Sequence, residues 1–401
     1  MAHGKTFVDE PNVNPELAKK AMNTGLALGV LGLIACAIGG YTAENERQVY
    51  YSGIIALMTF TTISLGGLFF VILHHLVRAS WSTSFRRIAE NVASAIPVMG
   101  VLAALVFGFG LGDLFHWSHP EAVAADPLLQ HKEGYLNTPF FAIRALVFFL
   151  GWTAIAFFYR KLSVQQDESG DVSLTFRMRW WAPVCILFFA LSVTFAGFDW
   201  MMGLDAHWFS TMFGVIIFSG CIVGGYATLG LIGLWLTKNG NLKNTLTEWN
   251  FHDVAKLMWG FIIFWTYTSF SQYFLIWYGN IPEETAWFYA RMHHGWERIA
   301  MLLIFGHFML PFWVILSRHM KRNRLVFGVV ACWMILMHYF DLYFMAMPNL
   351  HHHLHFHWLD LATFVCAGGF FLAAVMYRFT KDAAVAHRDP MLEASLNYYN
   401  Y

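Results

Sequence analysis

The sequence predicts an all-α integral membrane protein with about ten transmembrane helices, and its composition is the main reason. Hydrophobic residues make up 58% of the 401 residues and charged residues only 12%, whereas a soluble domain carries about 25% charged residues. The apolar residues also gather in runs of about 20 or more, the length that an α-helix needs to cross a hydrocarbon core about 30 Å thick. The 25 basic and 25 acidic residues balance, so no net charge indicates a nucleic-acid partner.

Ten apolar segments are long enough to span a bilayer. A polar N-terminal segment, 1–20, precedes this transmembrane domain, 21–379, and a polar tail, 380–401, follows it. No small-residue cleavage site follows the first apolar run, so we expect no cleaved signal peptide. The predicted spans are 21–41, 49–78, 91–116, 138–160, 179–200, 208–237, 251–279, 293–318, 325–347 and 359–379.

Basic residues are distributed unevenly over the connections between these spans. Only Arg47, Lys132 and Arg291 fall on one side, and nineteen fall on the other. The positive-inside rule places the richer side in the cytoplasm, and an even number of spans puts both termini there. The nineteen are Lys5, Lys19, Lys20, Arg78, Arg86, Arg87, Arg160, Lys161, Arg177, Arg179, Lys238, Lys243, Arg318, Lys321, Arg322, Arg324, Arg378, Lys381 and Arg388.

The cysteines predict no metal site, and the histidines give only a weak indication of one. The cysteines lie in apolar runs without the paired spacing that holds zinc, an iron–sulfur cluster or covalent haem, and we expect them to pack as small core residues. Histidines gather on the predicted outer loops, above all in the tract MPNLHHHLHFHWLD from 347 to 360. Because no acidic residue or thiol frames that tract except Asp360, a hydrated or partner-facing loop is favoured over a metal site, which stays open. The cysteines are Cys36, Cys185, Cys221, Cys332 and Cys366.

Titratable residues inside the spans are the strongest candidates for function. An unpaired charge in hydrocarbon is costly, so each must face the protein interior, water or a partner. Asp253 and Lys256 open the seventh span, His307 lies near the middle of the eighth, and His338 and Asp341 lie in the ninth. We call these five residues the polar ladder. They predict a proton half-channel that leads outward from the cytoplasm; a purely structural hydrogen-bonding role stays open.

Two other sites are considered from the same residue types. His307 and His338 lie at similar depth and could clamp a haem, but the remaining helix histidines cluster near the inner surface, which disfavours this hypothesis. Asp113, His116 and Arg144 lie at the outer membrane edge, where a quinol site needs a titratable group and a hydrogen-bond acceptor beside an apolar slot. The favoured alternative is an ion pair between Arg144 and Asp113 that only ties the third and fourth spans together.

The chain also shows a sign of internal duplication. The segment IRALVFFLGW from 143 to 152 and the segment RIAMLLIFGH from 298 to 307 each place an arginine near the outer end, followed by an alanine, five apolar residues and a glycine. Such a repeat predicts two four-helix bundles, at about 49–200 and 208–347, with flanking helices.

The stretch AGFDWMMGLDAHWFSTMFGVIIFSG, 196–220, and the segment 251–324 closely resemble the ActF-type membrane subunits of bacterial alternative complex III. These subunits belong with the NrfD or polysulfide-reductase membrane-subunit family, whose core is two four-helix bundles. The likeness covers the fifth to ninth spans specifically and the ten-helix plan throughout.

The resemblance implies a subunit of a quinol:cytochrome c oxidoreductase in the bacterial inner membrane. In such complexes iron–sulfur and multihaem cytochrome c subunits carry electrons, and NrfD-like subunits anchor them, bind quinol or provide proton paths. This chain has no ligand set for haem c or an iron–sulfur cluster, so we expect an anchoring and proton-handling subunit beside an NrfD-like paralogue. Two alternatives are a quinol-oxidising subunit, with quinol near Asp113 and His116, and an independent secondary transporter, which predicts broken helices at matched positions.

Overall fold

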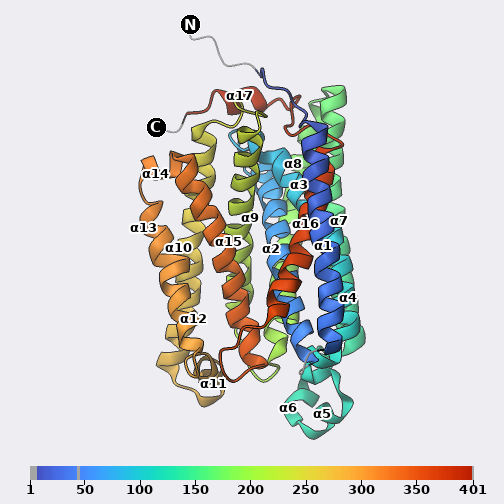
Figure 1. Ribbon diagram of the computed structural model, residues 1–401, viewed down its shortest axis with the longest axis vertical. Coiled ribbons are helices and arrows are strands. Elements are labelled where there is room, and N and C mark those ends of the chain that lie inside the picture. Colours follow the sequence, from blue (N-terminus) through green and yellow to red (C-terminus); the bar gives the residue numbers. More distant parts are fainter. Residues whose placement is uncertain (1–6, 43–45, 400–401) are drawn as a thin grey trace.

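Long helices run side by side along the length of the molecule (Figure 1). The computed structural model describes residues 7–42 and 46–399, and this part of the chain contains no strand. Lys5, one of the residues that set the predicted orientation, lies outside the described residues. The long helices are α1 (Pro15–Thr42), α2 (Arg47–Leu76), α4 (Ile96–Leu114), α7 (Thr138–Ser169), α8 (Ser173–Trp200), α9 (Phe213–Lys238), α10 (Glu248–Gly279), α15 (Arg324–Ala346) and α16 (Trp358–Phe379).

Shorter helices connect, extend or cap the long ones. They are α3 (Thr83–Ala93), η1 (His116–Ser118), α5 (Pro120–Ala125), α6 (Pro127–Lys132), η2 (Met202–Leu204), α11 (Pro282–Arg291), α12 (Trp296–Leu302), η3 (Leu303–Met309), α13 (Leu310–Val314), α14 (Arg318–Arg322), η4 (Met347–Asn349) and α17 (Leu392–Leu396). Both described ends of the chain lie at one end of the bundle, near α14 and α17, and we call this end the termini side (Figure 1). The opposite end carries α5, α6 and α11 and is called the loop side.

Nine helical stretches in the described part of the chain are long and apolar enough to cross a membrane. They coincide with nine of the ten predicted spans. The remaining predicted span, 251–279, lies within the single helix α10, whose 32 residues reach about 48 Å at 1.5 Å per residue. Its many tryptophan, tyrosine, serine and threonine residues make it less hydropathic than the other nine. The predicted all-α integral membrane fold is confirmed.

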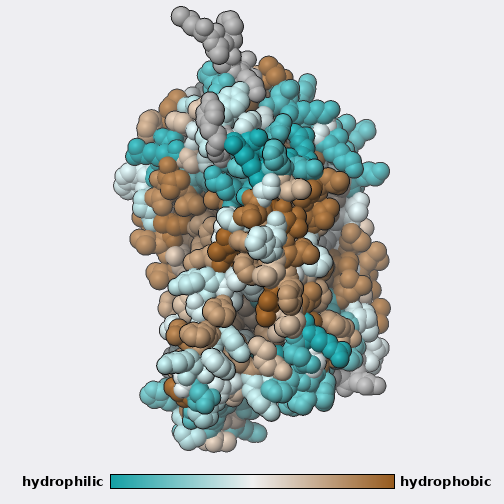
Figure 2. Space-filling model, turned by 90° about the vertical axis from the view of Figure 1, so that its left-hand side faces the viewer, coloured by the Kyte–Doolittle hydropathy of each residue, from teal (hydrophilic) through white to brown (hydrophobic). Residues whose placement is uncertain are grey.

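The surface is consistent with this fold. Figure 2 shows apolar residues over the middle of one face and hydrophilic residues gathered toward its two ends, most densely at the termini side. A band of this kind is what a protein presents to hydrocarbon between two layers of polar headgroups. The chain is therefore a multi-pass membrane protein.

Two of the predicted spans are interrupted helices. The third was predicted to begin at 91, but helical structure begins at Thr83 and breaks at Ser94 before α4 continues. The eighth span changes from α-helix to π-helix at η3 and returns to α-helix at α13. Pro311 explains the second interruption, because it has no N–H to donate to the turn before it. The breaks fall at the second helix of one predicted bundle and the third of the other, so they are not at matched positions.

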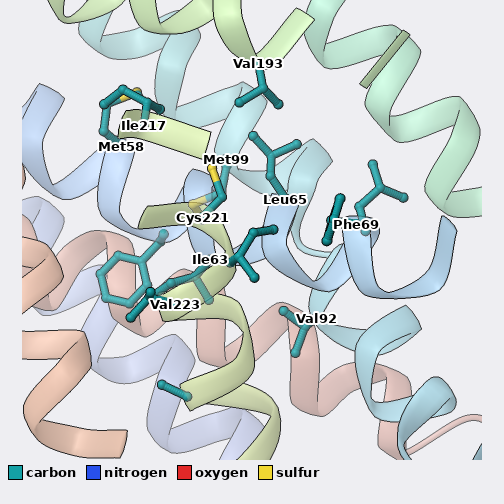
Figure 3. Packing of buried hydrophobic residues seen from close by; sticks show 14 of the residues in the cluster. Met58, Ile63, Leu65, Phe69, Val92, Met99, Val193, Ile217, Cys221 and Val223 are labelled. Carbon is teal, nitrogen blue, oxygen red and sulfur yellow. The ribbon is translucent and has the colours of Figure 1, made fainter. Parts of the chain in front are cut away.

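Helices α2 and α9 form the centre of the structure, and the whole apolar stretch of α2 is buried. An ideal Cβ on Gly66 would lie 2.1 Å from the carbonyl oxygen of Cys221 and 2.7 Å from Cα of Gly225, so only glycine permits this crossing. Figure 3 shows the packing around it, where Ile63 and Leu65 of α2 lie near Cys221 and Val223 of α9.

The first and last spans pair by the same kind of contact. Along α1, Gly25, Gly29 and Gly32 face the backbone of α16, and an ideal Cβ on Gly32 would lie 2.5 Å from the amide nitrogen of Cys366. Small residues allow two helices to approach this closely and to gain van der Waals contact along their length. Because most of α1 is otherwise exposed, this contact is its main attachment.

Replacing Gly32 by valine is expected to destabilise the protein, because the added side chain meets backbone that has no freedom to move aside. Overpacking of this kind costs about 1–3 kcal/mol or more. Thermal unfolding of the detergent-purified protein measures the effect. Gly108→Ala is the control, since no atom beyond the neighbouring residues and backbone of its own helix lies within 4 Å of a Cβ placed there. Equal midpoints for the two variants would show that α1 is not held by this contact.

Candidate functional site

Three residues of the polar ladder, His307, His338 and Asp341, lie close together in the middle of the bundle, between α10, α15 and the π-helix η3. His307 is fully buried, and its ring stacks on the indole of Trp265 with 3.8 Å between ring centroids. Trp265 Nε1 donates a hydrogen bond of 2.9 Å to Oδ2 of Asp341. Trp265 therefore contacts both His307 and Asp341. We call Trp265, His307, His338, Asp341 and Thr62 the central polar cluster.

His338 joins the cluster to α2. Its Nε2 lies 2.7 Å from the hydroxyl oxygen of Thr62, and the Thr62 hydroxyl itself donates to the carbonyl of Met58 at 2.6 Å. Since the hydroxyl has one proton to give, this geometry favours Nε2 as the donor to Thr62 and leaves Nδ1 of His338 as an acceptor. The ring packs against Gly220 and Gly224 of α9, and because Nε2 is already bonded to Thr62, the geometry of His338 adds no support to the haem hypothesis.

Neither ring nitrogen of His307 has a hydrogen-bond partner, and neither does Nδ1 of His338. Buried polar atoms are nearly always hydrogen-bonded, so unpartnered ones at a buried position deserve a functional explanation. His307 lies in the π-helix η3, and π-helical turns are frequent at functional sites. The carbonyl of Gly306, in the same turn, accepts a hydrogen bond of 2.7 Å from Trp333 Nε1 of α15, which fixes the turn against its neighbour.

Asp253 and Lys256, the other two ladder residues, are not brought to this cluster. They lie at the start of α10, where His252 Nδ1 is 3.5 Å and Lys256 Nζ is 3.9 Å from Oδ1 of Asp253. Twelve residues separate Asp253 from Trp265 on the same helix, a rise of about 18 Å. The ladder residues thus form two groups at different depths.

Arg144 forms its ion pair with Asp199 and not with the predicted partner Asp113. Its Nε and Nη2 donate to the two carboxylate oxygens of Asp199 on α8, at 2.7 and 3.1 Å, and its Nη1 donates to the carbonyl of Tyr135 at 2.9 Å. The predicted pair between Arg144 and Asp113 is therefore wrong. Bidentate geometry and full burial of Asp199 make Asp199 the better partner, because a buried carboxylate requires a fixed cation.

Asp113 and His116 lie apart from Arg144. His116 is exposed in η1, while Asp113 lines a cavity of about 450 Å³ between α1, α2, α4 and α16. Most of the lining is apolar, and Glu46 and Tyr50 join Asp113 among its few polar members. The three predicted residues do not form one site, but Asp113 does combine a titratable group with an apolar slot.

A buried cluster of charges at the termini side was missed by the sequence analysis. Arg87 is fully buried, with Nε 2.9 Å from Oε2 of Glu90 and Nη2 2.7 Å from Oδ2 of Asp167. Arg86 and Arg160 pair with acidic residues that follow α16, and these are Asp389 and Asp382. Residues 380–396, which we call the terminal strap, are thus tied to α3 and α7. The spacing of Arg86, Arg87 and Glu90 within one turn of helix is the signal that could have indicated this cluster.

Two of the five histidines in the tract make structural hydrogen bonds, and the other three, His352, His353 and His355, are exposed. His351 Nε2 lies 2.6 Å from Oε1 of Gln48, and His357 caps the start of α16. Asp360, buried beside it, accepts hydrogen bonds from Ser52 at 2.5 Å and from Gln48 at 3.1 Å. Within residues 7–42 and 46–399, no three histidine, cysteine or acidic side chains gather in a way that could hold a metal ion.

One prediction about the cysteines is wrong. Cys185, Cys221 and Cys366 are buried and Cys36 is half-buried, but Cys332 is exposed on α15. It lines an open apolar hollow between α15 and α9, together with Leu231 and Leu234 of α9.

The fold and the site together show a multi-pass α-helical membrane protein that encloses titratable groups among its helices. Comparison of the chain with models of protein families and with curated proteins gave no match. The central polar cluster and its surroundings are therefore the basis for any functional conclusion.

Removing one member of the Arg144–Asp199 pair is expected to cost more than removing both. Arg144→Met leaves a buried carboxylate without its cation, which costs about 3–5 kcal/mol, whereas Arg144→Met combined with Asp199→Leu leaves no charge behind. A double-mutant cycle on thermal unfolding in detergent measures the difference. If the loss of stability in the double variant equalled the sum of the losses in the two single variants, the pairing of Arg144 with Asp199 would be contradicted.

The amides of the loop-side helix α6 are expected to be less protected from hydrogen exchange in acid. Asp126 caps α6, and the hydrogen bond from His207 followed by those from the amides of Leu128 and Leu129 lowers the pKa of Asp126. A carboxylate with a lowered pKa in the folded state stabilises α6 above its unfolded pKa of about 3.9, and this contribution is lost as the pH falls through the lowered value. Amide hydrogen exchange of α6 between about pH 2 and 5 tests this, with Asp126→Asn as the control that should show little pH dependence.

Proposed function

We propose that this chain is a membrane subunit of a quinol:cytochrome c oxidoreductase of the alternative complex III type. It anchors the redox subunits and contributes a proton half-channel whose central groups are His307, His338 and Asp341. The termini side is proposed to face the cytoplasm of a bacterium, in agreement with the distribution of basic residues. The expected partners are an NrfD-like paralogue, an iron–sulfur subunit and multihaem cytochrome c subunits.

The central polar cluster is the observation that supports this proposal most directly. Histidine and aspartate enclosed among helices are expensive to bury and are typical of proton relays. Trp265 and His307 both lie in 251–324, the segment whose sequence resembles ActF-type subunits. The chain also has little mass outside its helices, which suits a subunit that works with soluble partners.

A second candidate is a quinol-binding subunit, and the cavity beside Asp113 favours it. Its volume of about 450 Å³ falls within the range of ligand pockets, and its carboxylate could accept a hydrogen bond from a hydroquinone. Because Arg144 is held by Asp199 and His116 is exposed, Asp113 would have to bind the head group without them. The transporter hypothesis has less support, since the helix breaks are not at matched positions.

Purification from native membrane in mild detergent, with identification of the bound subunits and a haem spectrum, is the first test. Recovery with multihaem cytochrome c and iron–sulfur subunits is the expected result. A lone, haem-free chain would contradict the proposal and favour the transporter hypothesis.

In the purified complex, Asp341→Asn and His307→Leu are each expected to leave assembly intact and to lower the number of protons moved per electron. The reason is that each change removes a group that binds a proton in the interior. Proton release by reconstituted vesicles during quinol oxidation is the measurement, and Glu283→Gln on the exposed helix α11 is the matched control. An unchanged stoichiometry in both variants would refute the proton-handling role.

A further inference from the structure

Helix α10 has a buried face that differs between its two halves. On the loop side of Trp265 this face carries Thr268 and Gln272, and on the termini side it carries Ile262 and Met258. All four side chains are at most 6% exposed, so all four line the interior rather than the lipid. The helix thus presents polar groups to the interior on one side of the central polar cluster and apolar groups on the other.

The polar half reaches the loop-side surface in a short distance. Gln272 is seven residues from Trp265, a rise of about 10 Å. Its Oε1 accepts a hydrogen bond of 2.7 Å from the hydroxyl of Ser210, which is partly exposed before α9. Two hydroxyls lie between Trp265 and Gln272 on α10. The Thr268 hydroxyl is bonded to the carbonyls of Phe264 and Trp265, and the buried hydroxyl of Ser269 has no partner.

The apolar half separates the cluster from the termini side. Ile262 and Met258 of α10 and Met334 and Ala331 of α15 are each fully buried. A proton moves only between groups that accept it or along water, and neither is favoured among aliphatic side chains. About 18 Å of α10 lie between Trp265 and Asp253.

We infer that His307 and Asp341 exchange protons with water on the loop side, along Thr268, Gln272 and Ser210, and are closed toward Asp253 and Lys256. This inference rests on the proposed proton-handling function and assigns the side of the membrane with which the cluster exchanges protons. It also adds Thr268 and Gln272 as positioning residues that hold water along this route. Under the proposed orientation, the open side is the outer side of the membrane.

Cysteine accessibility in the intact complex tests the inference without measuring proton movement. Gln272→Cys and Ile262→Cys are made separately and treated in sealed native-membrane vesicles of each orientation with a small, charged methanethiosulfonate reagent that does not cross membranes. His352→Cys marks the loop side and Lys243→Cys marks the termini side, since both positions are exposed. The wild-type chain, with its own cysteines, sets the background.

The expected result is that Gln272→Cys reacts from the same side as His352→Cys and that Ile262→Cys reacts from neither. We expect a rate ratio of about tenfold or more, because thiolate chemistry requires access to water. Reaction of Ile262→Cys from the side of Lys243→Cys would overturn the inference, and so would a Gln272→Cys that stays unreactive from both sides.

The experiments can refute the proposed function and the inferred loop-side opening independently of each other. If Gln272→Cys reacts as expected but Asp341→Asn and His307→Leu both leave the proton stoichiometry unchanged, the loop-side opening is real and the proton-handling function is wrong. If Asp341→Asn lowers the stoichiometry while Ile262→Cys reacts from the termini side, the function stands and the direction is wrong. Gln272→Leu gives a further readout, since it should slow proton exchange without changing complex assembly, whereas Ile262→Leu should change neither.

Discussion

The crossing of α2 and α9 at Gly66 and Gly225 is the contact on which the rest of the structure depends. Membrane helices gain little from the hydrophobic effect when they associate within lipid, so their packing relies on close van der Waals contact and on hydrogen bonds. Where the two backbones touch, neighbouring side chains such as Cys221 are enclosed on every side. The same approach brings His338 of α15 against α9 and within hydrogen-bonding distance of Thr62 on α2.

The number and position of the membrane helices could be predicted from the sequence because hydrocarbon permits few backbone solutions. An apolar run of sufficient length has to satisfy its own N–H and C=O groups, and a helix does so completely. α10 shows where hydropathy alone is a weaker guide, since aromatic and hydroxyl side chains lower its average without changing its helical geometry. The interruption at η3 follows from Pro311, but the sequence did not indicate that the distortion would form a π-helix around His307.

The candidate site was predictable only in part. His307, His338 and Asp341 stood out because titratable residues are rare at mid-depth, and the structure does place them near one another. Trp265 was not singled out, because in the sequence it is one of many tryptophans, and only its contacts with both His307 and Asp341 distinguish it. The partner of Arg144 was assigned wrongly for a related reason: acidic residues on α4 and α8 lie at similar depth, and helix packing decides between them.

The terminal strap has a consequence for how the protein is made. Arg86 pairs with Asp389, 303 residues later in the chain, and buried arginines without an anionic partner are unfavourable. At about 5–20 residues per second, translation takes about 15–60 s to supply the missing residues. During this interval the first helices are already synthesised while Arg86 still lacks its partner Asp389. Completion of this end of the bundle therefore waits for Asp382 and Asp389, and a product truncated before them would leave Arg86 and Arg160 without these partners.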